Sequence, residues 1–284
     1  MIEVDKVTRT YGQTVAVNEL SLQVQAGEVF AFLGPNGAGK TTTIKMTVGL
    51  LQPSVGAIRV RGFDVVHESL CAKRVLGYVP DQPYLYDKLT GREFLQFVGQ
   101  MYGMPDDDIQ AAMDVQLANF ELEAFIDQLT ENYSHGMKQR VTFASALLHE
   151  PSVLVVDEPM VGLDPRSARR VKEVFSDYAK AGNTVFMSTH TLAIAEQIAD
   201  RIGVIHHGQM LFLGSVDELR TRMSRGDSSL EDLFLALTEE PDTFTSDRED
   251  STDNRLSGGE TVLTETEDSD TQDTVTETPT ETSS

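Results

Sequence analysis

The chain has 284 residues and only one cysteine, Cys71. A lone cysteine has no partner for an intramolecular disulfide, so the fold depends on packing, and a reducing compartment is indicated. No run approaches the roughly 18 consecutive apolar residues that a membrane-spanning helix requires. Residues 1–5 lack the basic and apolar character of a secretory signal. We therefore expect neither a transmembrane segment nor a signal peptide.

Basic residues are also scarce: 23 lysines and arginines stand against 45 aspartates and glutamates, a formal net charge of −22. Neutralising a phosphate backbone needs basic stripes, so nucleic acid is not an expected partner. Residues 239–284 carry 15 of the acidic and 2 of the basic residues. This segment has too little apolar content to fold, which predicts a disordered, acidic, low-complexity tail after a folded domain at residues 1–238.

Strand and helix patterns alternate in the first part of the folded domain. Residues 28–33 form an apolar run that leads straight into glycines, which predicts a buried strand. Residues 41–51 read as a helix, with Pro53 just beyond its end. The pattern is helical over about residues 84–148, which predicts an inserted helical subdomain. Its amphipathic stripe is formed by Phe94, Phe97, Val98 and Met101.

The second part of the domain predicts a parallel sheet. Apolar strands at residues 152–156 and 184–188 flank a helix that opens at Asp164-Pro165 and continues to Ala181. Residues 206–209 lie between two apolar runs as a hairpin turn would, and residues 230–237 carry the apolar face of a last helix.

A phosphate-binding loop lies between the strand at 28–33 and the helix that follows it. Its glycines allow backbone N–H groups to surround phosphates, and the helix N-terminus adds partial positive charge. Lys40 supplies a full positive charge, and the Thr41 hydroxyl can bind Mg²⁺. A glycine-rich turn alone would not require lysine followed by threonine. The candidate ATP-binding residues here are Gly34, Pro35, Asn36, Gly37, Ala38, Gly39, Lys40, Thr41 and Thr42.

Two carboxylates follow the strand at 152–156. Asp157 stands where such enzymes place the second metal ligand, and Glu158 can polarise the water that attacks the terminal phosphate. A solvated pair of acidic residues leaving a strand is the plainer interpretation. The phosphate loop upstream favours the catalytic one, with Glu158, His190 and Lys40 as the catalytic set.

A further motif distinguishes among the proteins that use phosphate loops. Residues 132–140 read Asn-Tyr-Ser-His-Gly-Met-Lys-Gln-Arg and resemble the signature LSGGQ of the ABC (ATP-binding cassette) family. Ser134 and Gly136 match, whereas His135 and Met137 replace the usual glycine and glutamine. In the family this segment contacts the ATP held by the other subunit of a dimer. Ser134 is also a plausible helix cap, and the two roles are compatible.

Three other positions extend the resemblance over about residues 2–238. Asp164 lies in a D-loop, which crosses the dimer interface in the family, although an aspartate before Pro165 is also an ordinary helix cap. His190 resembles the switch histidine that senses the terminal phosphate. Tyr11 resembles the aromatic residue that stacks on adenine, and a tyrosine in a turn is the alternative.

The Q-loop departs from the family pattern. Residues 77–83 resemble it, yet Asp81 occupies the usual glutamine position and Gln82 follows one residue later. Either side-chain oxygen could reach Mg²⁺ or the attacking water. The expected metal ligands are Thr41, Asp157 and Gln82. Residues 84–90 are interpreted as the apolar base of a docking surface for a membrane partner, or as ordinary core residues.

The resemblance implies an α/β phosphate-loop NTPase of the ABC ATPase type. Its expected parts are a mixed sheet core, an antiparallel N-terminal β subdomain and the inserted helices. The expected function is ATP hydrolysis with Mg²⁺ by a dimer of this chain, or of this chain and a paralogue. The dimer would drive a separate integral membrane permease, most similar to exporter systems, from the cytoplasmic face of the membrane.

Two rival functions remain. A soluble ABC ATPase acting on ribosomes or nucleic acid usually carries two cassettes or a long coiled-coil insert, and this chain shows neither. A phosphate-loop kinase or GTPase would not explain the signature, D-loop and switch histidine together.

Overall fold

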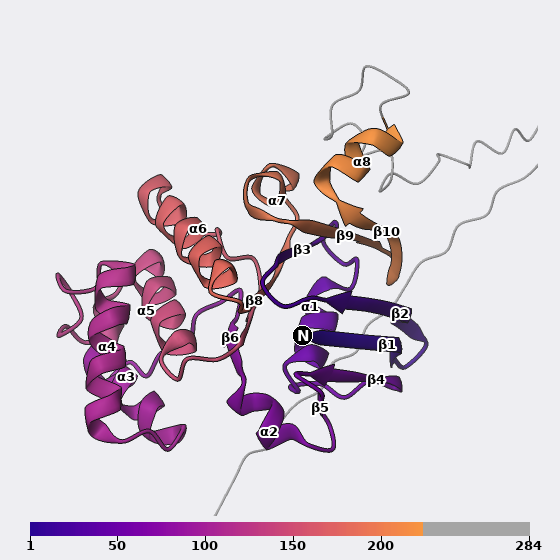
Figure 1. Ribbon diagram of the computed structural model, residues 1–284. Helices are drawn as coiled ribbons and strands as arrows, with labels where there is room; N and C mark the ends of the chain where they lie inside the picture. The colour runs from indigo at the N-terminus through magenta and orange to yellow at the C-terminus, as the bar shows by residue number, and fades with distance from the viewer. Residues whose placement is uncertain (224–284) are drawn as a thin grey trace, which may run out of the picture. The chain divides into compact units, whose positions relative to one another are not determined.

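The computed structural model describes residues 1–223, which contain two β-sheets and surrounding helices (Figure 1). The smaller sheet has four strands in the order β2-β1-β4-β5, all paired antiparallel. Its strands are β1 (Ile2–Tyr11), β2 (Thr14–Val24), β4 (Val55–Val60) and β5 (Phe63–Asp64). This sheet confirms the expected antiparallel N-terminal β subdomain.

The larger sheet has six strands in the order β10-β9-β3-β8-β7-β6. Its strands are β3 (Val29–Leu33), β6 (Leu76–Val79), β7 (Val153–Val156), β8 (Thr184–Thr189), β9 (Arg201–His206) and β10 (Gln209–Ser215). All neighbouring pairs are parallel except β9 with β10, which form the predicted hairpin at residues 206–209. The sheet is therefore mixed, as expected.

The central strand β3 explains why its sequence is uniformly apolar. All five of its residues are buried, and their side chains alternate between two cores. Val29, Ala31 and Leu33 pack in the core shared with the helical segment. Phe30 and Phe32 pack in the core shared with the antiparallel sheet. Each phenylalanine buried in this way contributes about 1.5–3 kcal/mol.

The helices lie on both sides of the larger sheet. They are α1 (Lys40–Thr47), α2 (Ser69–Arg74), α3 (Gly91–Met101), α4 (Asp106–Phe120), α5 (His135–Leu147), α6 (Pro165–Lys180), α7 (Leu192–Ile198) and α8 (Val216–Met223), with a 3₁₀ turn η1 at Thr130–Asn132. Figure 1 shows α3, α4 and α5 together at the left, away from the antiparallel sheet. These three helices form the helical segment and lie within the predicted range 84–148.

One sequence prediction needs correction. The helix expected at residues 41–51 ends at Thr47, because Gly49 takes a left-handed φ of 71° that ends the helical path. The apolar stripe on α3 is only partly buried, since Phe97 and Met101 are 38% and 71% exposed. The helix predicted at residues 230–237 and the tail at 239–284 lie outside the described residues.

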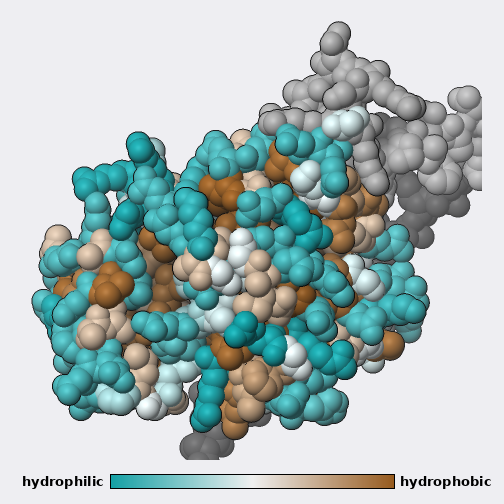
Figure 2. Space-filling model, in the orientation of Figure 1, coloured by the Kyte–Doolittle hydropathy of each residue, from teal (hydrophilic) through white to brown (hydrophobic). Residues whose placement is uncertain are grey.

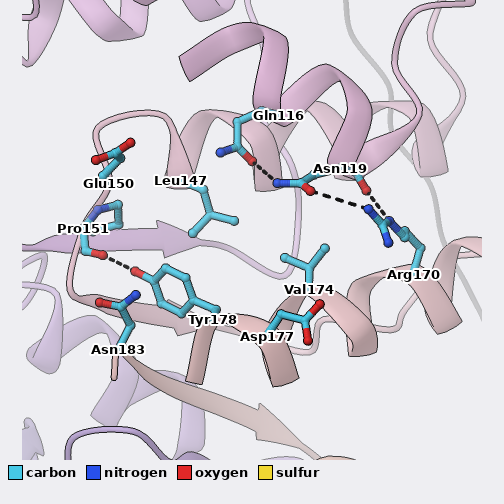
Figure 3. Close-up of a pocket in the computed structure, with 10 residues that line it drawn as sticks. All are labelled: Gln116, Asn119, Leu147, Glu150, Pro151, Arg170, Val174, Asp177, Tyr178 and Asn183. Atoms are coloured by element: carbon cyan, nitrogen blue, oxygen red, sulfur yellow. Dashed lines mark hydrogen bonds between the residues drawn. The ribbon is translucent and has the colours of Figure 1, made fainter. Parts of the chain in front are cut away.

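A hollow of about 390 Å³ lies where the helical segment meets α6 (Figure 3). On one side, Arg170 of α6 donates from Nε to the backbone oxygen of Asn119 in α4 at 2.8 Å. On the other side, the Tyr178 hydroxyl donates to the backbone oxygen of Pro151. These two bonds tie α6 to the helical segment and to the start of β7.

Within residues 1–223, no helix is both long enough and apolar enough to cross a membrane. The face shown in Figure 2 is largely hydrophilic, with separate hydrophobic patches between the polar residues.

Candidate functional site

The parallel strands bring the predicted site residues to one edge of the larger sheet. The register pairs Leu33 with Thr189, and Val156 with both Val79 and Met187. The segments that follow β3, β6, β7 and β8 therefore leave the sheet side by side. They carry the phosphate loop, Asp81, the Asp157-Glu158 pair and His190, respectively. Ligands of α/β folds bind at this carboxyl edge.

The phosphate loop passes directly into α1. Gly39 is the residue before the helix and has a φ of 106°, and a Cβ at this position would lie 2.6 Å from the backbone oxygen of Ala16. Glycine is thus required both by conformation and by space. No side chain caps α1, so the N–H groups of its first turn remain available to an anion.

Lys40 lies at the start of α1 and is 6% exposed. Its Nζ donates to the backbone oxygens of Gly34 at 2.7 Å and Pro35 at 3.1 Å. Burial lowers the pKa of Lys40, and the nearby Glu158 and Asp157 carboxylates oppose that shift. Backbone oxygens of the phosphate loop thus hold Lys40 as a buried cation at the start of α1.

Glu158 connects the lysine to the histidine. Its Oε1 lies 3.7 Å from Lys40 Nζ, and its Oε2 lies 3.0 Å from His190 Nδ1. The Glu158 backbone has a φ of 50°, which is uncommon for a residue other than glycine. The three residues proposed as catalytic from the sequence therefore lie in direct contact.

Asp157 is almost completely buried beside them, with 1% of its surface exposed. Burial raises the pKa of Asp157, while hydrogen bonds from Ser188 and Thr41 oppose that rise by stabilising the carboxylate. Ser188 holds both acidic residues, because its hydroxyl donates to Asp157 Oδ1 and accepts the N–H of Glu158 at 3.1 Å. Sequence reasoning did not assign Ser188 a role; its only signal was a hydroxyl within a buried strand.

A cavity of about 220 Å³ opens at this edge. Its lining residues are Ala16, Asn36, Gly37, Gly39, Lys40, Thr41, Thr42, Asp81 and Glu158. The remaining loop positions, Gly34, Pro35 and Ala38, are not among the lining residues. The backbone oxygens of Gly34 and Pro35 accept the Lys40 bonds. A cavity lined by the uncapped start of α1, a lysine and two carboxylates suits a phosphate group attacked by water.

The Q-loop residues are placed differently from each other. Asp81 lines the cavity, and its charge also raises the pKa of Asp157. Gln82 is exposed and is not among the lining residues. Tyr78, at the preceding strand end, is held neutral because burial, together with Asp157 and Asp81, raises its pKa to about 12.

The signature and D-loop residues do not line this cavity. Ser134 is exposed and caps α5, accepting the N–H of Met137 at 3.3 Å. Asp164 caps α6, accepting from Arg166 and Ser167, each at 3.0 Å. The cap interpretation therefore holds for both residues, and their proposed contacts with a partner's nucleotide stay predictions.

Tyr11 lies at the tight turn between β1 and β2, is 47% exposed and is also absent from the lining. The Arg9 guanidinium lies over its ring, 4.8 Å from the centroid. Adenine stacking on Tyr11 stays a prediction.

The fold and the site together define a phosphate-loop ATPase. Residues 17–161 match the family described as ABC transporter. The chain belongs to this family and is an ATP-binding, ATP-hydrolysing transporter subunit.

Similar proteins cover most of the described chain. The linearmycin resistance ATP-binding protein LnrL of Bacillus subtilis is 36% identical over 231 residues, which span 81% of this chain and 74% of that protein. The Nod factor export ATP-binding protein I of Paraburkholderia xenovorans is 37% identical over 218 residues, or 77% of this chain and 72% of that protein.

Two solved structures share the fold. One, an ATP-binding subunit of an ABC transporter, is 32% identical with a TM-score of 0.79, and the match covers 84% of this chain and all of that one. A dimeric ATP-binding cassette in a post-hydrolysis state, bound to ADP and Pi, is 25% identical with a TM-score of 0.70, covering 76% of this chain and 99% of that one.

Proposed function

We propose that two copies of this chain, or one copy and a paralogue, close on ATP and drive a separate membrane permease that exports its substrate. The proposal rests on one observation: the predicted ATP-contacting residues of this chain lie in two separate places. Lys40 and Glu158 line the cavity, whereas Ser134 is exposed elsewhere on the same chain. A second copy can supply its Ser134 to the open side of the first copy's cavity. The dimeric post-hydrolysis relative supports such an arrangement.

The hydrolytic roles follow from the contacts. The N–H groups of the loop and the Lys40 ammonium hold the phosphates and offset the charge that develops on them. Glu158 is placed to orient the attacking water and accept its proton. His190, 3.0 Å from Glu158, holds that carboxylate in place and can donate to the terminal phosphate.

The donor set at this edge fits Mg²⁺. The Thr41 hydroxyl and the Asp157 carboxylate already contact each other, and Asp81 adds a carboxylate at the cavity wall. Hard oxygen ligands of this kind are the ones Mg²⁺ prefers. Thr41 and Asp157 would hold the ion, which would neutralise phosphate charge. Asp81 is the better-placed Q-loop candidate because it lines the cavity, whereas the predicted role of Gln82, which does not line it, stays a prediction from the sequence.

The permease would dock beside the Q-loop. Tyr84, Tyr86 and Phe97 are 78%, 48% and 38% exposed, and the Tyr86 ring centroid lies 6.1 Å from that of Tyr84 and 5.6 Å from that of Phe97. An exposed aromatic group of this kind marks an interaction surface. Docking there would place the chain at the cytoplasmic face of the membrane. The export direction rests on relatives named for resistance and export.

The test of the ATPase roles is Glu158→Gln. This variant should bind ATP, form a stable dimer in light scattering and lose turnover by at least about 100-fold. Glu123→Gln, at an exposed carboxylate between α4 and α5, is the matched control and should behave as wild type. Normal turnover in Glu158→Gln, or a variant that stays monomeric with saturating ATP, would refute the proposal.

The test of the transport role is ATPase activity with and without the membrane protein encoded beside this one. Stimulation that is lost in Tyr84→Ala but kept in Leu70→Ala, an equally exposed side chain on α2, supports docking at the Q-loop. Stimulation by ribosomes or DNA in place of the membrane protein contradicts it.

A further inference from the structure

The His135 ring of the signature lies directly against Gly162, the glycine two residues before Asp164. A Cβ at Gly162 would lie 2.1 Å from His135 Cδ2 and 2.6 Å from His135 Nε2. A Cβ at Gly162 would therefore force the His135 ring to move. Gly162 also has a φ of 75°, in the left-handed region.

The neighbouring signature residue approaches the same point. A Cβ at Gly136 would lie 3.3 Å from the backbone oxygen of Gly162. The first turn of α5 and the segment after β7, separated by more than twenty residues in sequence, therefore meet at one glycine.

Gly162 belongs to a short turned segment that begins at Glu158. The N–H of Val161 donates to the backbone oxygen of Glu158 at 3.3 Å, and the N–H of Leu163 donates to that of Met160 at 3.4 Å. These bonds shorten the path between Gly162 and Glu158. Gly162 therefore lies in a hydrogen-bonded turn that begins at the residue whose carboxylate faces Lys40.

We propose that His135 is a positioning residue that joins the signature turn to the segment carrying Glu158 in the same chain. When Ser134 engages a partner's triphosphate, the ring passes the movement of α5 to the chain's own Glu158. The two ATP sites of the dimer are thereby coupled. This inference rests on the dimer in the proposed function and deepens it.

The ring acts by its shape. Within residues 1–223 the His135 side chain makes no hydrogen bond, and its contact with Gly162 is through ring atoms. Glycine, which the family usually has at this position, would leave the space beside Gly162 empty. Phenylalanine would fill it, so His135→Phe should retain the coupling, whereas His135→Ala should lose it.

The contact itself is tested on the protein without nucleotide, by thermal unfolding. Gly162→Ala and Gly103→Ala impose the same left-handed strain, because Gly103 has a φ of 73°, but a Cβ at Gly103 meets no atom within 4 Å. Gly103→Ala should lower Tm by about 2–4 °C, and Gly162→Ala by more than that, because the His135 ring must also move. Adding His135→Ala to Gly162→Ala should bring the loss back to that of Gly103→Ala. Equal losses in the two single variants would show that the ring does not hold Gly162.

The coupling is tested by ATPase kinetics. His135→Ala should lower the Hill coefficient for ATP to about 1 and weaken ATP-dependent dimerisation in the Glu158→Gln background by about fivefold or more. Affinity of the monomer for a fluorescent ATP analogue should not change, because the ring lies outside its own cavity. His67→Ala, an exposed histidine before α2, is the control and should leave all three quantities unchanged.

The outcomes separate the two proposals. If Glu158→Gln alone fails to dimerise with ATP, the proposed dimer is wrong. If it dimerises but His135→Ala keeps wild-type cooperativity, the coupling role of His135 is wrong while the dimer stands. Loss of cooperativity in His135→Phe as well as His135→Ala would assign the role to the ring nitrogens and overturn coupling by ring shape.

Discussion

The carboxyl edge of the larger sheet and the first turn of α5 both carry motif residues, but they differ in how completely the chain satisfies them. At the sheet edge, Lys40 and Asp157 are 6% and 1% exposed and each has several partners. At α5, Ser134 and His135 are exposed, and Ser134 bonds only within its own turn. A site completed by its own chain is buried and bonded in advance. The exposed first turn of α5 is what the proposed contact with a partner requires.

The largest effect is expected at the sheet edge, where the site residues are buried. Lys40→Ala removes a charge that the loop oxygens already position, so ATP affinity should fall about 10- to 100-fold. Equilibrium binding of a fluorescent ATP analogue measures this loss. Lys45→Ala, later in α1 and exposed, is the control and should leave the affinity unchanged.

The next effect concerns the joint between the helical segment and the sheet. His149 follows α5, stacks on Tyr102 at a centroid distance of 3.6 Å and shares a 3.2 Å hydrogen bond with the backbone oxygen of Leu76. Burial lowers the pKa of His149 to about 4, from an ordinary value near 6.5. Between these values the unfolded chain binds the proton and the folded chain does not. Stability should therefore fall as the pH drops from 6.5 toward 4.

The size of this loss is on the order of 2–3 kcal/mol across the whole window, and about 1.4 kcal/mol by pH 5.5. Urea unfolding at pH 7.5 and pH 5.5 measures it. His149→Gln keeps a side-chain N–H for Leu76 and cannot titrate. The variant should lose less stability than wild type between the two pH values; an equal loss would mean that other groups cause it.

Ser188→Ala tests whether the acidic pair needs its buried hydroxyl. The change removes the donor to Asp157 and the acceptor for the Glu158 N–H, so the free energy of unfolding should fall by about 1–3 kcal/mol and turnover should fall with it. Ser188→Thr keeps the hydroxyl and should be less affected. Full turnover in Ser188→Ala would show that Glu158 is positioned without this bond.

The smallest effect on stability is expected at the exposed first turn of α5. Ser134→Ala removes one exposed cap and should cost about 0.5–1 kcal/mol in urea unfolding, with monomer affinity for ATP unchanged. Dimerisation in the Glu158→Gln background should nevertheless weaken. Loss of monomer affinity instead would place Ser134 at its own chain's site and erase the contrast between the two regions.

The two regions also differ in how far they could be predicted. Asp157 and Glu158 are predicted from their position after an apolar strand, and His190 from its resemblance to the family's switch histidine. The structure brings them together because parallel strands place their carboxyl ends at one edge. Ser188 was not assigned, since a hydroxyl inside a strand gives no pattern until its neighbour strand is known. The helix predicted at residues 41–51 extends past Thr47, the observed end of α1, because residue type alone does not reveal the left-handed φ of 71° at Gly49.

By itself, the sequence determined the class of the protein, the phosphate loop and the acidic pair, because these depend on residue types at fixed local spacing. Tertiary structure alone decided that Asp81 reaches the cavity and Gln82 does not, that Ser188 binds both carboxylates, and that His135 packs on Gly162. Each of these contacts joins segments far apart in the chain. Their distances depend on strand register and helix packing, which local pattern does not encode.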